Sequence, residues 1–122
     1  MKKLILIAIL LTATTSGALF AQDKAEQYST LFNEGVKKSG EQNFKDAIEL
    51  FNKALEIKAD YKEAMFARGQ CYLLTEERNK ACDDFEKCTK LGLYQANEYI
   101  EKYCGKNAPG RTQKPSVTIS PK

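Results

Sequence analysis

Two consecutive stretches of 34 residues decide the fold: residues 28–61, YSTLFNEGVKKSGEQNFKDAIELFNKALEIKADY, and residues 62–95, KEAMFARGQCYLLTEERNKACDDFEKCTKLGLYQ. When the second stretch is laid under the first, similar residues recur at the same places and in the same order. Such a period predicts a helical repeat, in which each unit packs on its neighbour. The matching pairs are Phe32 and Phe66, Gly35 and Gly69, Ala47 and Ala81, Phe51 and Phe85, Lys53 and Lys87, and Ile57 and Leu91.

The first unit has the pattern of two helices. We expect the first helix over about residues 24–39, with Gly40 as a left-handed stop. We expect the second over about residues 44–58, with Asn43 as its N-cap. The apolar residues at helical spacing predict its buried face: Ala47, Ile48, Phe51, Ala54 and Leu55.

The second unit repeats this arrangement. Asp60 is followed three residues later by Glu63, a spacing that is typical of a capping box and predicts where the next helix begins. Its partner helix is expected over about residues 80–91, with Gly92 after it. A last helix over residues 94–104 is expected to cover the apolar face that two units leave open. The side chains predicted to pack from it are Tyr99, Ile100 and Tyr103.

These residues resemble the tetratricopeptide repeat family, whose 34-residue unit carries large and small residues on a first helix and Ala, an aromatic residue and Ala on a second. The resemblance covers residues 28–95 and implies an all-α fold: two helical hairpins plus a C-terminal capping helix. It also implies binding of another protein. The matching residues are Leu31, Gly35, Phe44, Ala47, Phe51 and Ala54 in the first unit, and Met65, Gly69, Tyr72, Ala81, Phe85 and Cys88 in the second.

The chain departs from the family pattern at several positions. Glu34 and Arg68 stand where the pattern has Leu, and Lys38 replaces the Tyr of the first unit. Neither unit has the proline that usually closes the repeat, since Ala59 and Leu93 stand there. The small residues at the other positions let the two helices of each unit approach closely.

The first 21 residues have the pattern of a secretory signal peptide. Lys2 and Lys3 precede an apolar run over residues 4–11, and small residues follow up to Ala21. The run is too short to span a bilayer, which takes about 20 apolar residues. We therefore expect cleavage after Ala21 or Ala18 and an exported protein, periplasmic or secreted, without a membrane span.

The predicted domain, residues 22–104, is mildly acidic, and a basic segment follows it. The domain holds 13 basic and 16 acidic residues, a net charge of −3, which does not indicate a nucleic-acid-binding surface. Residues 105–122 hold four basic residues, no acidic residue and all three prolines. This composition predicts a disordered tail.

Four cysteines in an exported protein make disulfides possible, and sequence alone allows three pairings. Cys82 and Cys104 lie about ten and twelve residues from the turn near Gly92, so in an antiparallel helix pair they reach similar heights. Cys71 and Cys88 differ in height by roughly 7 Å, and we expect them to stay reduced or to be only weakly coupled. A similar ending is found in small exported bacterial tetratricopeptide proteins, and that resemblance supports a Cys82–Cys104 bridge.

Catalytic or metal chemistry has little support in the sequence. There is no histidine, no glycine-rich phosphate loop and no Cys-x-x-Cys pair, and gaps of 11, 6 and 16 positions between the cysteines do not suit a zinc site. The acidic pairs Glu76–Glu77 and Asp83–Asp84 are predicted to be solvated. We expect a protein that is not an enzyme and uses no cofactor.

The family resemblance implies a partner-binding surface on the first helix of each unit, for a peptide or a helix. Phe32, Phe66 and Leu73 are candidates for a shallow apolar groove, with completion of the core or a homodimer contact as the alternatives. Self-association as a structural subunit is the second hypothesis, and a thiol redox protein is a third. The residues predicted to line the surface are Ser29, Phe32, Asn33, Val36, Phe66, Gln70 and Leu73.

Overall fold

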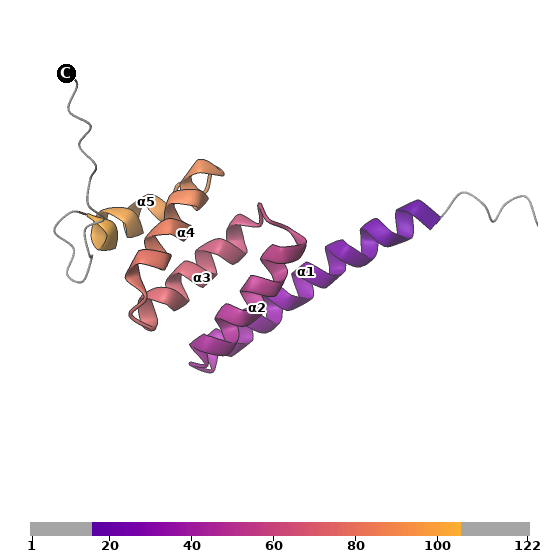
Figure 1. Cartoon of the computed structure of the whole chain (residues 1–122), viewed down its shortest axis with the longest axis horizontal. Coiled ribbons are helices and arrows are strands. Elements are labelled where there is room, and N and C mark those ends of the chain that lie inside the picture. Colours follow the sequence, from indigo (N-terminus) through magenta and orange to yellow (C-terminus); the bar gives the residue numbers. More distant parts are fainter. Residues whose placement is uncertain (1–15, 106–122) are drawn as a thin grey trace, which may run out of the picture.

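The computed structural model describes residues 16–105, and within this range every regular element is a helix. The first hairpin consists of α1 (Ser16–Gly40) and α2 (Phe44–Ile57), and the second of α3 (Lys62–Leu74) and α4 (Arg78–Lys90). A short α5 (Ala96–Tyr99) continues into the π-helix η1 (Ile100–Cys104). Figure 1 shows the two hairpins side by side, with α5 and η1 beyond α4. The predicted all-α fold is confirmed.

The two hairpins share the same close contact between their helices. An added Cβ atom on Gly35 would lie 2.6 Å from the ring of Phe51, and one on Gly69 would lie 2.8 Å from the ring of Phe85. Both phenylalanines are fully buried. A glycine on the first helix of each hairpin therefore gives the aromatic ring of the second helix its space.

The turns inside the hairpins also match. Asn43 N–H donates to the carbonyl of Lys38, and Glu77 N–H donates in the same way to the carbonyl of Tyr72. The residue before each donor is left-handed, with φ of 63° at Gln42 and 64° at Glu76. This is the Schellman arrangement of a helix end. It recurs after α4, where Gly92 has φ of 87°.

Two of the predicted helix ends are wrong. Gly40 is the last residue of α1 rather than its left-handed stop, because the backbone reverses two residues later, at Gln42. Asp60 does not cap α3: Tyr61 holds the N-cap position, and no side chain bonds the first turn. Asn43 does precede α2, but its side chain makes no capping hydrogen bond either.

The C-terminal segment differs from the single helix that we predicted over residues 94–104. It is α-helical for one turn and then widens into η1. Tyr99, Ile100 and Tyr103 pack against the core of the second hairpin, as expected. The segment therefore covers the open end of α3 and α4.

The predicted leader and tail lie largely outside the described residues. Residues 1–15 and 106–122 are not described, and α1 starts at Ser16, within the predicted leader. Helix α1 runs through both predicted cleavage positions, Ala18 and Ala21. Between residues 16 and 105 no helix has the length and apolar character of a membrane span.

Candidate functional site: the exposed face of α1 and α3

The candidate partner surface is the side of α1 and α3 that turns away from the packed interior. On α3 the buried side chains of Met65 and Tyr72 and the backbone of Gly69 mark the inward side. Residues spaced by three and four positions on the opposite side form one stripe. We call this stripe, with its counterpart 34 positions earlier on α1, the A-helix face. Its members are Ser29, Asn33, Val36 and Gly40 on α1, and Glu63, Ala67, Gln70 and Leu74 on α3, of which Ala67 lies at the margin, partly buried against the core of the first hairpin.

The A-helix face has a largely uncharged surface. Val36 is 47% exposed and Leu74 is 60% exposed, two of the largest exposed apolar side chains in the described part of the chain. Asn33 is exposed as well, and Glu63 is the one charged member. This surface suits a partner with apolar side chains, and the exposed amide of Asn33 is available for a polar contact.

Four of the seven predicted residues belong to this face, and two of these four already have bonding partners. The Ser29 hydroxyl donates to the carbonyl of Glu26, 2.9 Å away on its own helix. The Gln70 amide donates to the Tyr99 hydroxyl at 2.8 Å, so it anchors α5 on α3. Asn33 and Val36 are the two whose side chains are exposed.

The other three predicted residues pack into the hairpins. Phe32 lies with its ring centre 5.1 Å from that of Tyr61 and 5.8 Å from that of Phe51. Phe66 is enclosed in the same way, since its ring centre lies 5.1 Å from that of Tyr99. Leu73 is partly buried against the core of the second hairpin. For these residues the structure favours the alternative that they complete the core.

Sequence reasoning missed Leu74, which is more exposed than Val36, the other large apolar side chain of the A-helix face. The family resemblance predicts Leu73 instead, and one helical position turns a side chain by about 100°. The signal that finds Leu74 is its register: Glu63, Ala67, Gln70 and Leu74 follow the spacing of Ser29, Asn33, Val36 and Gly40.

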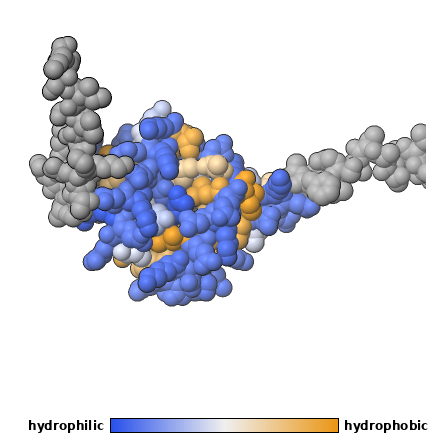
Figure 2. All heavy atoms as spheres, viewed as in Figure 1, coloured by the Kyte–Doolittle hydropathy of each residue, from blue (hydrophilic) through white to orange (hydrophobic). Residues whose placement is uncertain are grey.

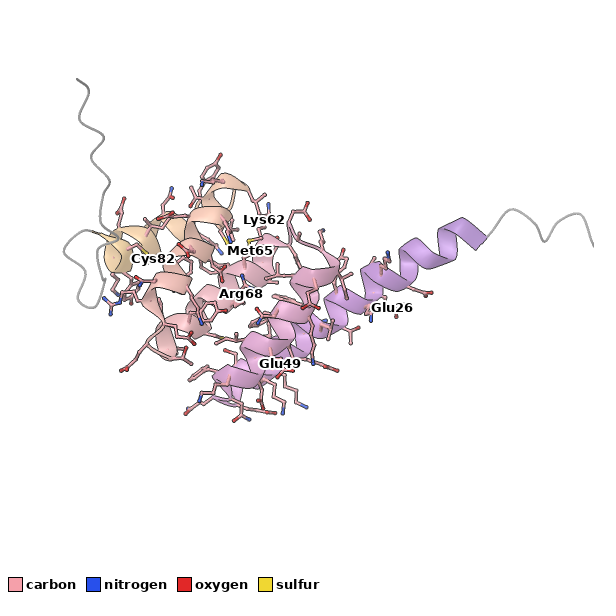
Figure 3. The ribbon with its side chains drawn as sticks, viewed as in Figure 1. Glu26, Glu49, Lys62, Met65, Arg68 and Cys82 are labelled. Atoms are coloured by element: carbon pink, nitrogen blue, oxygen red, sulfur yellow. A yellow bond between two sulfur atoms is a disulfide. The ribbon has the colours of Figure 1, made fainter. Side chains whose placement is uncertain are left out.

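A second feature missed from the sequence is a buried ion pair between the two helices of the second hairpin. Arg68 on α3 donates from Nε to Oδ2 of Asp84 at 2.8 Å and from Nη2 to Oδ1 at 2.7 Å. The side chain of Asp84 is 2% exposed, so the prediction that Asp84 is solvated is wrong. Figure 3 labels Arg68 on α3, which lies between α2 and α4.

The ion pair keeps Arg68 charged. Burial tends to lower the pKa of Arg68, but the hydrogen bonds and the charge of Asp84 outweigh it, so that pKa lies above its usual value. The third donor of the guanidinium, Nη1, bonds Oδ1 of Asn52 on α2 at 2.6 Å. Arg68 thus connects three helices, which explains a charged residue where the repeat pattern has Leu.

The four cysteines fall into two classes. The sulfur atoms of Cys82 on α4 and Cys104 on η1 lie 2.09 Å apart, with 5.7 Å between their Cα atoms, and both residues are buried. Cys71 and Cys88 are buried free thiols in the two different apolar clusters. Burial raises the pKa of both thiols, that of Cys88 to about 11.

The remaining surface gives little support for a site of another kind. A shallow hollow on α5 and η1 is lined by Glu98, Tyr99, Lys102 and Tyr103. In residues 16–105 no cluster of metal-ligating side chains is found. Figure 2 shows that hydrophilic side chains cover most of the visible face, around an apolar area near its middle.

Comparison with known families identifies the second hairpin. A family model described as a tetratricopeptide repeat matches residues 62–91, which are α3, the turn and α4. Neither the curated proteins nor the solved structures gave a match. Tetratricopeptide repeats generally mediate protein–protein interactions, and the proteins that carry them are typically adaptors without enzymatic activity.

Proposed function

We propose that this chain is a protein-interaction module that binds a partner peptide or helix on its A-helix face. The observation that carries the proposal is the pair of exposed apolar side chains, Val36 and Leu74, on the first helices of two matching hairpins. Apolar side chains of a partner that covered these two residues would remove them from water, a gain of roughly 25 cal/mol per Å² buried. The tetratricopeptide match to the second hairpin supports the same class of function.

The proposal includes a place in the cell. The N-terminal pattern of residues 1–21 supports export to the periplasm or the medium, where a Cys82–Cys104 disulfide is chemically stable. We therefore propose an adaptor or scaffold of the cell envelope, whose folded part begins after the leader and ends at Cys104. Residues 105–122 then form a basic segment outside the repeat domain.

Self-association is the alternative function, and stacking of hairpins from two copies is the form that the repeat suggests. On α3 the residues that pack toward the first hairpin are apolar and buried, Ala64 and Cys71 among them. The matching positions on α1 are Thr30 and Lys37, both exposed. A solvated outer face suits the end of an array better than a contact with another hairpin.

Affinity capture with matched variants tests the proposal. We expect the Val36→Asp, Leu74→Asp double variant to lose proteins that the unmodified chain captures from envelope extracts after cross-linking. Lys53→Asp on the exposed side of α2 is the control, because it changes the net charge by the same amount, −2, on another face. A partner lost equally from both variants contradicts the proposed face.

Sedimentation of the purified protein separates the alternative. A monomer at micromolar concentration is expected for an adaptor. A stable dimer would favour the structural subunit instead.

A further inference from the structure

The contact between the two hairpins is mainly apolar. Apolar contacts depend only weakly on the orientation of the groups that make them. Ile48 and Leu55 on α2 each pack against both buried clusters of the molecule. Burial of apolar surface holds α2 and α3 together but is nearly indifferent to small rotations between them. An angle that is well defined needs a directional contact as well.

Arg68 supplies such a contact. Asp84 holds the edge of the guanidinium formed by Nε and Nη2 through hydrogen bonds of 2.8 and 2.7 Å, and this fixes the plane of the group within the second hairpin. The remaining Nη1 donor then points in one direction, where it bonds Asn52 of the first hairpin at 2.6 Å. The Arg68 side chain is 18% exposed, so water competes little for this bond.

The ion pair is absent from the first hairpin. The position that matches Arg68 holds Glu34, which is exposed, and the position that matches Asp84 holds Leu50. A helical hairpin of this repeat thus folds without the ion pair. Because the ion pair is present in the second hairpin alone, we look for its role at the contact between the two hairpins.

We infer that Arg68, held by Asp84, is a positioning residue that sets the angle between the two hairpins through its bond to Asn52. The A-helix face is built from α1 of one hairpin and α3 of the other, so this angle determines its shape. The consequence for partner binding rests on the proposed function, but the angle itself is measured without a partner.

Residual dipolar couplings of backbone amides test the inference on the isolated protein. In the unmodified protein we expect the couplings of both hairpins to fit one alignment tensor. In Asn52→Ala the couplings of the two hairpins are expected to require two different alignment tensors, one of smaller magnitude than the other. The couplings within each hairpin should still fit the coordinates of that hairpin. Arg68→Lys should give the same result, because a lysine keeps the charge beside Asp84 but lacks the planar fork that reaches Asn52.

Asn97→Ala is the matched control. Oδ1 of Asn97 accepts a hydrogen bond from Thr89, which joins α5 to α4 and leaves the hairpin contact untouched. It should retain one common tensor. Unchanged common alignment in Asn52→Ala and Arg68→Lys overturns the inference and leaves the proposed binding face standing, whereas loss of partner capture alone would concern that face.

Discussion

At the scale of single residues, the ion pair of Arg68 and Asp84 has the largest energetic consequence. Both oxygens of a carboxylate that is 2% exposed are bonded by one guanidinium. Such a pair gains little over well-packed apolar residues, because both charges give up their hydration. Loss of one member is destabilising, because the other charge then stays buried and unpaired.

Arg68→Leu is therefore expected to lower the free energy of unfolding by about 3–5 kcal/mol. The double variant Arg68→Leu, Asp84→Leu should recover most of that loss, because it removes the buried charge and copies the Leu50 that the first hairpin has at the matching position. Urea denaturation followed by circular dichroism measures both. Equal losses in the single and the double variant would contradict this account.

Ionisation of the Cys88 thiol is expected to make the free energy of unfolding fall at alkaline pH. Its pKa is raised to about 11 in the folded protein, chiefly by burial and then by the negative charge of Asp84, whereas an unfolded cysteine titrates near 8.5. The unfolded chain loses the proton first, so stability that is complete below about pH 8.5 falls as the pH rises toward the folded value.

We expect the free energy of unfolding to fall between pH 8 and pH 10.5 by about 1–2 kcal/mol more in the unmodified protein than in Cys88→Ala. Alanine is the residue of the first hairpin at this position, Ala54, which is likewise fully buried. The pKa of Cys71 is also raised, so its thiol lowers the free energy of unfolding at alkaline pH in both proteins. The difference between the two pH profiles therefore reports the effect of Cys88. Parallel pH profiles for the two proteins would show that Cys88 is not the cause.

At the scale of the elements, the close approach of helices within a hairpin depends on a missing side chain. The Cβ atom of an alanine at Gly69 would come within 2.8 Å of the buried ring of Phe85, and the corresponding contact at Gly35 is 2.6 Å. A fully buried ring has no room to retreat. The helix ends, by contrast, tolerate non-glycine residues in the left-handed conformation, at Gln42 and Glu76.

Gly69→Ala sets overpacking, which costs about 1–3 kcal/mol, against a gain in helix propensity of about 1 kcal/mol. We expect a net loss of stability. Gly40→Ala is the control, because nothing lies within 4 Å of its added Cβ and the position is helical; it should be neutral or stabilising by up to about 1 kcal/mol. Thermal melting compares the two, and a Gly69→Ala protein as stable as Gly40→Ala would contradict the packing.

At the scale of the whole molecule, two matching hairpins leave their end open, and α5 with η1 closes it. Tyr99 contacts Phe66 and Phe85, and η1 places Cys104 beside Cys82. So short a segment has little helical stability of its own. A covalent link at its far end is an effective way to hold it on α4.

A Cys82–Cys104 bridge across a sequence separation of 22 is expected to contribute about 3 kcal/mol. The double variant Cys82→Ser, Cys104→Ser should lose about that amount and become insensitive to reductant. Thiol counting on the unfolded, unreduced protein checks the premise: two reactive thiols are expected, from Cys71 and Cys88, and four would contradict the bridge.

The sequence by itself determined the class of fold and the packing inside each hairpin. The all-α fold follows from residue types that recur every 34 positions. The packing of the Phe51 ring on Gly35 follows from the same recurrence, because contacts inside one hairpin depend on local spacing. The residue type alone was a poor guide at Gly40, which predicted a helix end that the backbone makes at Gln42.

Only the tertiary structure decided which of the remaining side chains are free to meet a partner. Phe66 is covered because Tyr99, 33 positions later, returns to it, and Asp84 is buried because Arg68, 16 positions earlier, reaches it. The contact of Arg68 with Asp84 has no counterpart in the first hairpin, where Glu34 and Leu50 hold the matching positions, so the 34-residue period carries no sign of it. Val36 and Leu74 stay exposed because no other segment of residues 16–105 covers them.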